Sequence, residues 1–360
     1  MPFYYQIDSS NEAGRRTAER LVTLRDRLAA EVPPRTLNDT LLLATWNIRE
    51  FDSAAYGTRL DESFYYIAEI ISHFDLVAVQ EVREDLEALK RLNRILGGFW
   101  KYVVTDVTEG TPGNDERLAY LYDSRKVRFS GLAGEVVIPP KEVKNKKGKL
   151  IRYEASDQLY RTPFLVGFNS GWAKFMLCTV HIIYGEDKAD NPKRVQEIKL
   201  VADFLAERAD RESAGRNNLI LLGDFNIYGR GDKTMAAITN AGFTVPEVLR
   251  DIPATNVGKE KRHYDQIAFK VRAQRLKALS AGVFDFYNVV FTNDDQELYV
   301  PDMQPAYDVN SKGKKRNAAG KRTYYRTYWR THQMSDHLLM WVELGIDFGE
   351  EYLRAKAQGD

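Results

Sequence analysis

The sequence contains one cysteine, Cys178, among 360 residues. A single thiol excludes any intrachain disulfide and any metal site built from several cysteines, and it is typical of a reducing compartment. The N-terminus, MPFYYQIDSSNEAGRR, lacks a basic segment followed by an apolar one, so it shows no secretory signal. A cytoplasmic location is therefore the expectation, and any chemistry must use ligands other than thiolates.

Long apolar runs are also missing. The longest, such as residues 219–222 and 289–291, extend over a few residues, whereas a membrane-spanning helix needs about 18 or more. Net charge is nearly absent as well, because 52 Lys and Arg oppose 51 Asp and Glu, which leaves +1. With 44% hydrophobic and 12% aromatic residues, the chain can still bury a sizeable core, so we expect a folded protein that does not span a membrane.

Short apolar runs separated by turns predict strands, and these outnumber the stretches with helical periodicity. The predicted strands cover residues 41–46, 76–79, 118–122, 127–138, 164–168, 175–180, 219–222, 267–271 and 338–344. The predicted helices cover residues 9–31, 60–73, 84–96 and 192–212, with a capping box at Ser9 and Glu12 and a cap at Asn191. No repeat and no Pro/Gly/Ser-rich hinge divides the chain, which favours one large α/β domain.

Two stretches depart from the balanced charge, and both are predicted to be loops. Residues 141–161 hold seven basic side chains against three acidic ones, and an ordinary solvated loop explains them as well as a ligand contact does. Residues 301–330 interleave aromatic rings with eight basic side chains, which are Lys312, Lys314, Lys315, Arg316, Lys321, Arg322, Arg326 and Arg330. Because cations mixed with rings suit phosphate backbones and stacked bases, the second stretch is predicted to contact a polyanion.

Polar residues stand at one end of six predicted strands. Four of these strands are followed by their polar residues, and two are preceded by them. If all of them meet at one sheet edge, the last two strands must run opposite to the first four, so we expect mixed sheets. The many short strands favour two packed sheets flanked by helices. The residues concerned are Asn47, Glu81, His181, Asp224, Asn226, Asp265, Asp336 and His337.

Together these residues would supply four carboxylates, two amides and two imidazoles. Oxygen ligands without cysteine suit Mg²⁺, Mn²⁺ or Ca²⁺, and four carboxylates at one edge would repel one another without a cation. The two histidines titrate near neutrality and would transfer protons, each oriented by an acidic partner. The combination indicates metal-assisted hydrolysis of a phosphate ester.

Seven motifs in fixed order over residues 41–345 resemble the endonuclease/exonuclease/phosphatase superfamily. They are ATWN (44–47), VQE (79–81), RTPF (161–164), VH (180–181), GDFN (223–226), YDQI (264–267) and SDH (335–337). The segment NDERLAYLY (114–122), followed by the RTP turn, is most similar to the deoxyribonuclease I branch. The resemblance implies a four-layered αββα sandwich and Mg²⁺-dependent hydrolysis of phosphodiesters or phosphomonoesters. The expected domain covers residues 39–348, with a helical extension at 1–38, a basic insertion near 303–331 and a tail at 349–360.

The resemblance also implies two catalytic pairs. Asp265 would pair with His337, which would act as general base on the attacking water. Glu116 would pair with His181, which would protonate or hydrogen-bond the leaving or non-bridging oxygen. A histidine at this position disfavours the apurinic-site repair branch, whose members usually have tyrosine or asparagine there.

The remaining positions are assigned in the same way. Glu81 would ligate the metal with Asn47 and Asp336, while Asp224 and Asn226 would orient the nucleophile and the scissile phosphate. The resemblance also implies a phosphate contact by Arg161. The insertion lies outside the shared motifs, and its mixture of cations and rings leads us to expect further substrate contacts there, from Lys312, Lys314, Lys315, Arg316, Arg322 and Arg326.

Two features depart from the deoxyribonuclease I branch. The secreted members of that branch have disulfides and a signal peptide, neither of which is expected here. The tyrosine with which the branch contacts the DNA minor groove corresponds to a position near Asn114 in this sequence, so the mode of DNA binding is expected to differ.

The remaining cysteine and histidines are given structural roles. Cys178 and His181, three apart on a strand, point to opposite faces, so Cys178 is predicted to be a small buried residue. His263 and His332 flank motifs and are expected at the surface.

These observations predict a divalent-metal phosphodiesterase, and specifically a nuclease that hydrolyses DNA endonucleolytically. Mg²⁺ is the expected cofactor, with Mn²⁺ as an alternative and Ca²⁺ as an accessory ion. A phosphatase or phosphodiesterase of the same fold, acting on phosphoinositides, sphingomyelin-type lipids or nucleotides, is the alternative. An inactive nucleic-acid-binding protein fits least, because every expected catalytic position is filled.

Overall fold

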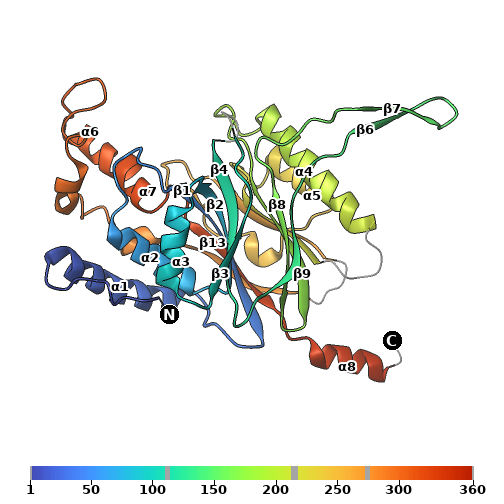
Figure 1. Cartoon of the computed structure of the whole chain (residues 1–360), viewed down its shortest axis with the longest axis horizontal. Coiled ribbons are helices and arrows are strands. Elements are labelled where there is room, and N and C mark those ends of the chain that lie inside the picture. The colour runs from blue at the N-terminus through green and yellow to red at the C-terminus, as the bar shows by residue number, and fades with distance from the viewer. Residues whose placement is uncertain (1, 110–113, 212–217, 272–275, 359–360) are drawn as a thin grey trace.

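The structure is a computed structural model of the chain, and it describes residues 2–109, 114–211, 218–271 and 276–358. Two β-sheets lie face to face, with α1, α2 and α3 outside one sheet and α4 and α5 outside the other (Figure 1). The sequence-based expectation of an αββα sandwich of mixed sheets is therefore confirmed. Among the described residues, no helix combines the length and the apolarity needed to cross a bilayer.

The strands form two main sheets and one hairpin. The six-stranded sheet has the order β12-β13-β1-β2-β4-β3, the five-stranded sheet has the order β11-β10-β9-β8-β5, and β6 pairs with β7. The strands are β1 (Thr40–Phe51), β2 (Leu76–Arg83), β3 (Trp100–Val104), β4 (Glu116–Asp123), β5 (Arg128–Glu135), β6 (Lys141–Lys144), β7 (Leu150–Glu154), β8 (Phe164–Ser170), β9 (Ala173–His181), β10 (Asn218–Asp224), β11 (Asp265–Lys270), β12 (Ala278–Phe284) and β13 (Leu339–Gly345). The helices are α1 (Glu12–Glu31), α2 (Asp61–Ser72), α3 (Glu87–Leu96), α4 (Pro192–Arg211), α5 (Lys233–Asn240), α6 (Ala318–Thr323), α7 (Arg330–Gln333) and α8 (Gly349–Ala357).

The two-sided burial of β1 explains why its sequence is a continuous apolar run. Alternate side chains of a strand point to opposite faces. Leu41 and Leu43 therefore enter the core between the two sheets, whereas Leu42 and Trp46 enter the core beneath the helices. The same run thus connects both cores and ends at Asn47 on one edge of the sheet.

Strand direction follows the expectation from the polar residues. β1 is parallel to β2, and β9 is parallel to β10. β13 runs antiparallel to β1, and β11 runs antiparallel to β10. The carboxyl ends of β1, β2, β9 and β10 therefore meet the amino ends of β11 and β13 at one edge, at the top of Figure 1.

Two predicted helix caps have different outcomes. The side chain of Asn191 accepts hydrogen bonds from the backbone N–H groups of Lys193 and Arg194, so the predicted cap of α4 is confirmed. The capping box at Ser9 and Glu12 is wrong, because α1 begins two residues later than expected from Ser9 and its cap is Asn11, which accepts from Gly14 N at 2.8 Å. The predicted end of α4 at residue 212 lies outside the described residues.

Both basic stretches contain regular structure, which corrects the prediction of loops. Residues 141–154 form the β6–β7 hairpin, which projects from the body of the protein (Figure 1). Its side chains are mostly exposed, so no apolar alternation marks it in the sequence. The insertion contains α6, a π-helical turn at Tyr324–Trp329 and α7. There, Tyr325 and Trp329 are buried four residues apart, a helical spacing hidden among many cations.

Besides the two strands of the hairpin, β3 and β12 were not predicted. β3 is five residues long, and β12 has the sequence ALSAGVF, in which small residues weaken the apolar pattern. Each forms hydrogen bonds with a strand that was predicted, β3 with β4 and β12 with β13. A segment with a weak apolar pattern thus becomes a strand because its neighbour in the sheet supplies the hydrogen bonds.

The N-terminal helix packs against the main body, as predicted. Arg16 forms an ion pair with Glu62 of α2 at 2.9 Å, and Arg20 forms one with Asp295 at 2.6 Å. Leu21, Leu24 and Leu28 belong to the core beneath α2 and α3.

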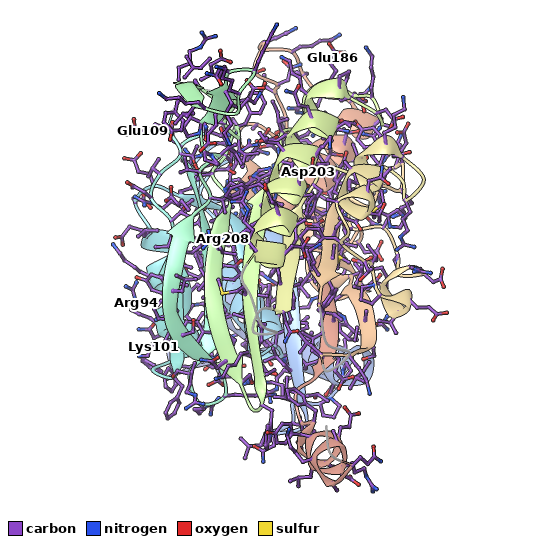
Figure 2. The ribbon with its side chains drawn as sticks, turned by 90° about the vertical axis from the view of Figure 1, so that its right-hand side faces the viewer. Arg94, Lys101, Glu109, Glu186, Asp203 and Arg208 are labelled. Carbon is purple, nitrogen blue, oxygen red and sulfur yellow. The ribbon has the colours of Figure 1, made fainter. Side chains whose placement is uncertain are left out.

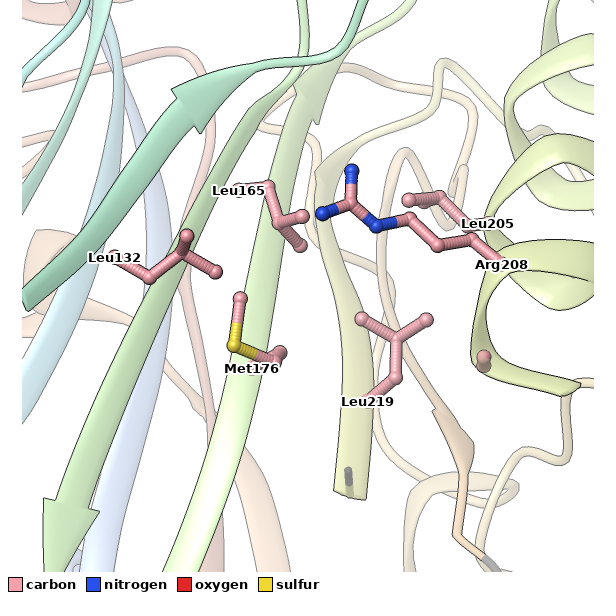
Figure 3. Close-up of a pocket in the computed structure, with 7 residues that line it drawn as sticks. Leu132, Leu165, Met176, Leu205, Arg208 and Leu219 are labelled. Carbon is pink, nitrogen blue, oxygen red and sulfur yellow. The ribbon is translucent and has the colours of Figure 1, made fainter. Parts of the chain in front are cut away.

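Helix α4 covers the five-stranded sheet, and Figure 2 shows it from outside with Asp203 and Arg208 labelled along it. Between α4 and the sheet, Leu165, Met176 and Leu219 line a small cavity beside Arg208 (Figure 3). Its volume is about 30 Å³, close to the space of a single water molecule. We therefore assign this cavity to the packing of α4 rather than to a ligand.

A cluster of ion pairs lies at the sheet edge opposite the one where the polar site residues meet. Asp75, which is fully buried, accepts from Leu42 N, from Arg35 Nε at 2.7 Å and from Lys126 Nζ at 2.7 Å. Arg35 also pairs with Asp123 at the end of β4. One carboxylate thus connects β1, β2 and the segments on both sides of them.

We expect Asp75→Ala to lower the free energy of unfolding by about 3–5 kcal/mol, because it leaves the buried Lys126 ammonium without its carboxylate. Denaturant unfolding would measure this loss. Asp203→Ala, which removes the exposed i,i+4 pair with Lys199, is the control and should cost no more than about 0.5 kcal/mol. Equal effects of the two substitutions would contradict the role given to Asp75.

His332 lies in α7 and is fully buried, which corrects its predicted surface position. Its Nε2 is 2.8 Å from the carbonyl oxygen of Ser53. Burial, with the positive charges of Arg59 and Arg49, lowers the pKa of His332 to about 4. The folded protein therefore holds this imidazole neutral at a pH where the unfolded chain already protonates it.

Stability should consequently fall as the pH drops from about 6.5 to about 4, by up to about 3 kcal/mol from this residue alone. His332→Gln keeps a donor for Ser53 and removes the titration. Its free energy of unfolding, measured by denaturant at several pH values, should therefore fall less steeply than that of wild type. Parallel curves for the two proteins would disprove this assignment.

Candidate active site

The predicted site residues converge at the upper sheet edge of Figure 1. Asp224, the last residue of β10, lies between two neighbours in register, His181 of β9 and Asp265 of β11. Asn47 and Glu81 arrive from β1 and β2, and His337 from the segment before β13. Glu186, labelled at the top of Figure 2, lies in the loop that continues from β9 at the same edge.

His181 forms the first histidine–carboxylate pair. Its Nδ1 is 2.5 Å from Glu116 Oε1, and both side chains are nearly inaccessible. Burial alone would lower the pKa of His181, but the nearby Glu116 carboxylate outweighs it and raises the pKa. Arg161 Nε lies 2.8 Å from the same Glu116 oxygen, so one carboxylate contacts both the imidazole and a guanidinium.

His337 forms the second pair. Its Nδ1 is 2.9 Å from Asp265 Oδ2, and the backbone N–H of Asp265 donates to Thr255 Oγ1. Burial acts against protonation of His337, yet the charges of Asp265 and Asp224 raise its pKa well above the usual value. The ring of Tyr264 lies against this imidazole, with 5.4 Å between the ring centroids.

The carboxylate of Asp224 stands between the two histidines. Its Oδ2 is 3.5 Å from His181 Nε2 and 3.6 Å from His337 Nε2. The same oxygen accepts from Asn47 Nδ2 at 3.0 Å, while Oδ1 accepts from Asn226 N at 2.8 Å. Because each Nδ1 is engaged by its own acid, both Nε2 atoms face the centre of the site.

The backbone around Asp224 explains the GDFN motif. Gly223 has φ +131°, and a Cβ there would lie 2.2 Å from the carbonyl oxygen of Val180. Only glycine allows β9 and β10 to approach so closely at this point. Asn226 and Glu81 have φ of 53° and 62°, a left-handed conformation that is uncommon outside glycine and often occurs at functional sites.

Glu81 and Asn47 form a separate oxygen-rich corner. Asn47 Nδ2 donates to Glu81 Oε1 at 3.0 Å, and the backbone N–H of Glu50 donates to Glu81 Oε2 at 2.7 Å. Burial, together with the charges of Glu116 and Asp336, raises the pKa of Glu81. The buried Asn47 Oδ1 has no hydrogen-bond partner among the described residues. Such an unpaired oxygen beside crowded carboxylates fits the ligand set of a hard divalent cation.

A second acidic group could also hold a metal. Ligand atoms of Asp224, Asp265 and His337 all lie within 4.8 Å of one another, and the three residues are buried. Asp265 Oδ1 likewise lacks a partner among the described residues, and burial raises the pKa of Asp265. However, Asp265 Oδ2 and His337 Nδ1 already bond to each other, which leaves this group arranged as a proton-transfer pair.

Two groups of predicted residues lie outside this centre. Asp336 is partly exposed, and its Oδ2 is 3.8 Å from Arg49 Nε. Of the six basic residues predicted in the insertion, Lys312, Lys314 and Lys315 lie in an exposed turn, Arg316 is half-buried, and Arg322 and Arg326 are exposed. Within the described residues, no hydrogen bond or ion pair joins any of the six to His181 or His337, so their predicted role in binding stays a prediction.

Several residues that hold the site together were not singled out by the sequence. Ser335 Oγ donates to Asn47 O at 2.5 Å and accepts from His337 N at 2.9 Å. Trp46 Nε1 donates to the carbonyl oxygen of His337 at 2.9 Å. Both residues belong to recognised motifs, so the motifs themselves were the available signal. Glu197 of α4 accepts from Tyr160 N and Ile183 N, and nothing in its helical sequence indicated this.

An αββα fold with two histidine–carboxylate pairs at one sheet edge defines a hydrolase of phosphate esters. Residues 44–337 match the Endonuclease/Exonuclease/phosphatase family. The chain belongs to this family, in agreement with the resemblance in the seven motifs.

Two relatives are named deoxyribonucleases. A deoxyribonuclease of Thioalkalivibrio sp. (strain K90mix) is 30% identical over 202 residues, which are 54% of this chain and 48% of that protein. Human deoxyribonuclease-1-like 2 is 25% identical over 280 residues, or 74% of this chain and 90% of that protein. The chain thus spans about half the length of the first relative and most of the second.

Solved structures agree in fold. Humanized TDP2 of D. rerio has a TM-score of 0.50 and 12% identity, covering 85% of this chain and 98% of that chain. A mannosyl-6-phosphatase of Bacteroides thetaiotaomicron VPI-5482 has a TM-score of 0.52 and 16% identity, covering 84% and 99%. At these identities the likeness concerns the fold.

Replacing Glu116 should lower the pKa of His181. Glu116→Gln removes the carboxylate that raises it most, and burial and the Arg161 charge are then opposed by the Asp224 charge. The Asp224 carboxylate, 3.5 Å from Nε2, still favours the protonated imidazole, so we expect the pH at which His181 loses its proton to move down only by the part that Glu116 contributes. NMR titration of the imidazole in the presence of a chelator would measure this. Glu207→Gln, at an exposed position of α4, is the control and should leave the titration unchanged. An unaltered titration in Glu116→Gln would rule out the pairing.

Proposed function

We propose that this protein is a divalent-metal-dependent nuclease that hydrolyses phosphodiester bonds of DNA. The observation that carries the proposal is the convergence of two acid-paired imidazoles on one point, with both Nε2 atoms within 3.6 Å of Asp224 Oδ2. Two proton-transfer groups on either side of one position suit a reaction in which one oxygen attacks a phosphate and another leaves.

The two histidines would divide the proton transfers. His337, in its neutral form and held by Asp265 through Nδ1, would accept the proton of the attacking water at Nε2. His181, held by Glu116, would donate a proton or hydrogen bond from Nε2 to an oxygen of the phosphate. Asp224 lies within reach of both Nε2 atoms and would orient the water and stabilise each imidazolium as it forms.

Glu81 and Asn47 would hold the cation, with Asp336 completing the set from the opposite side. A bound Mg²⁺ or Mn²⁺ would polarise the phosphate and neutralise its developing charge. Asn226 and Arg161 would position the phosphate. The partly exposed Asp336 must then exchange its contact with Arg49 for the metal or share it.

Two observations support DNA as the substrate. Two relatives are named deoxyribonucleases, and they are similar to this chain over 54% and 74% of its length. In addition, basic segments project on both sides of the active-site edge, the β6–β7 hairpin and the insertion with α6 (Figure 1). Cations flanking an acidic centre suit a polyanion that is cut at one phosphate.

The proposal predicts that supercoiled plasmid is cleaved with Mg²⁺ or Mn²⁺ and that a chelator abolishes cleavage. His181→Ala and His337→Ala should each lower the rate by roughly 100- to 10,000-fold, because each removes a general acid or base. Cleavage would be followed on gels for wild type and variants at equal protein concentration.

His73→Ala is the matched control. His73 caps α2 and contacts the Glu69 carbonyl oxygen, so this substitution should leave cleavage unchanged. The same panel includes RNA, inositol phosphates and sphingomyelin, each with Mg²⁺, Mn²⁺ or Ca²⁺. Intact DNA under every condition, or much faster hydrolysis of a lipid or inositol phosphate, would overturn the proposal.

A further inference from the structure

A groove lies between the basic insertion and the loop that follows β1. It has a volume of about 790 Å³, within the roughly 300–1,000 Å³ typical of ligand sites. One wall comes from Tyr56 and Gly57, and the other comes from Ala306, Arg316, Tyr324 and Tyr328. Figure 1 shows α7 next to the loop after β1, in agreement with the contacts of Tyr56 with Tyr328 and His332.

Three tyrosines, Tyr56, Tyr324 and Tyr328, line this groove. Tyr56 and Tyr328 meet across it with 5.9 Å between ring centroids and an interplanar angle of 35°. Tyr328 is 40% exposed, although its neighbour Trp329 is buried. An exposed ring in a concave surface offers a flat face to a planar ligand, and nucleic-acid bases are such ligands.

Arg316 supplies a fixed cation beside the rings. Its Nε donates to the carbonyl oxygen of Ala306, and its guanidinium lies 4.7 Å from the centroid of Tyr324. Within the described part of the chain it forms no ion pair, so most of its donors remain available for a phosphate. The groove also contains one carboxylate, Asp302, whereas the acid Asp308 is paired with Lys321.

The groove is connected to the active site through Arg49. This residue follows Asn47 by two positions on β1, and its Nε lies 3.8 Å from Asp336 Oδ2. Its guanidinium also lies 5.0 Å from the centroid of Tyr56 and donates to Thr331 Oγ1 of α7. A strand whose phosphate occupies the active site would therefore reach the groove within a short distance.

We propose that this groove binds unpaired nucleotides of the DNA strand being cut, with a base stacked on Tyr328 and a phosphate held by Arg316. The proposal rests on the proposed nuclease function and makes it more specific. In a duplex the faces of the bases are covered by their neighbours, so only an unpaired or frayed segment can present them to the rings. The protein accordingly binds single-stranded segments next to the scissile bond more tightly than a blunt duplex.

Fluorescence anisotropy would test this in the presence of a chelator, so that binding is measured without cleavage. The probes are a fluorescein-labelled single-stranded oligothymidylate and a blunt DNA duplex of equal length. Tyr328→Ala should weaken single-strand binding by roughly 5- to 100-fold and affect the duplex much less. Tyr328→Phe, which keeps the ring, should restore wild-type affinity.

Tyr5→Ala is the matched control. Tyr5 is also an exposed tyrosine, and it lies by Trp100 at the sheet edge opposite the active site. Thermal melting of all variants identifies any that are misfolded, in which case Arg316→Met tests the same groove. Unchanged single-strand binding in Tyr328→Ala, or equal losses for both probes, would overturn the inference. Plasmid cleavage by wild type is measured in parallel, because its absence would contradict the proposed function without bearing on the anisotropy.

Discussion

The contact of Asp224 with both histidines is the constraint on which the site depends. His181 is supplied by β9 and His337 by the segment before β13, so the two belong to different sheets. Asp224, at the end of β10, lies 3.5 and 3.6 Å from their Nε2 atoms. The two sheets must therefore pack in one relative position, and the apolar core between them holds that position.

This arrangement concentrates acids at a buried edge, which is costly unless each charge has a partner. Glu116 bonds to His181 and Asp265 to His337, while Asn47 donates to both Glu81 and Asp224. The raised pKa values of Glu81 and Asp265 show that the compensation is incomplete. A divalent cation would remove the remaining repulsion, which connects the electrostatics of the edge to the proposed chemistry.

The insertion beside the six-stranded sheet lies outside the motifs shared with the family. Motif residues such as Ser335 and Trp46 fix the catalytic segments, but the insertion adds α6, α7 and a groove of tyrosines beside them. Arg49 contacts both Asp336 and Tyr56, so the added segment is joined to the catalytic edge rather than appended at a distance. Through these contacts of Arg49, the insertion can influence which substrates reach the proposed metal-binding residues Glu81 and Asn47.

The sequence by itself indicated two packed mixed sheets and most of the residues that gather at their common edge. Two-sided apolar runs such as residues 41–46 must be buried on both faces, and polar residues at their ends must gather at one edge. It failed where signals are weak or masked by charge. The β6–β7 hairpin has exposed side chains, β12 is built of small residues, and His332 is buried by an insertion whose helices are rich in cations.

Only the tertiary structure decided how the gathered residues are used. The family resemblance implied both acid–imidazole pairs, and the structure shows them, but sequence order without that resemblance cannot tell which acid faces which imidazole. Glu116 and His181 are 65 residues apart, and Asp265 and His337 are 72 apart. Nor can it show that Arg49 turns toward Tyr56, or that Tyr328 stays exposed while Trp329 is buried. These outcomes depend on how the two sheets pack on each other and how the insertion packs beside α1 and α2, a long-range property that no local pattern contains.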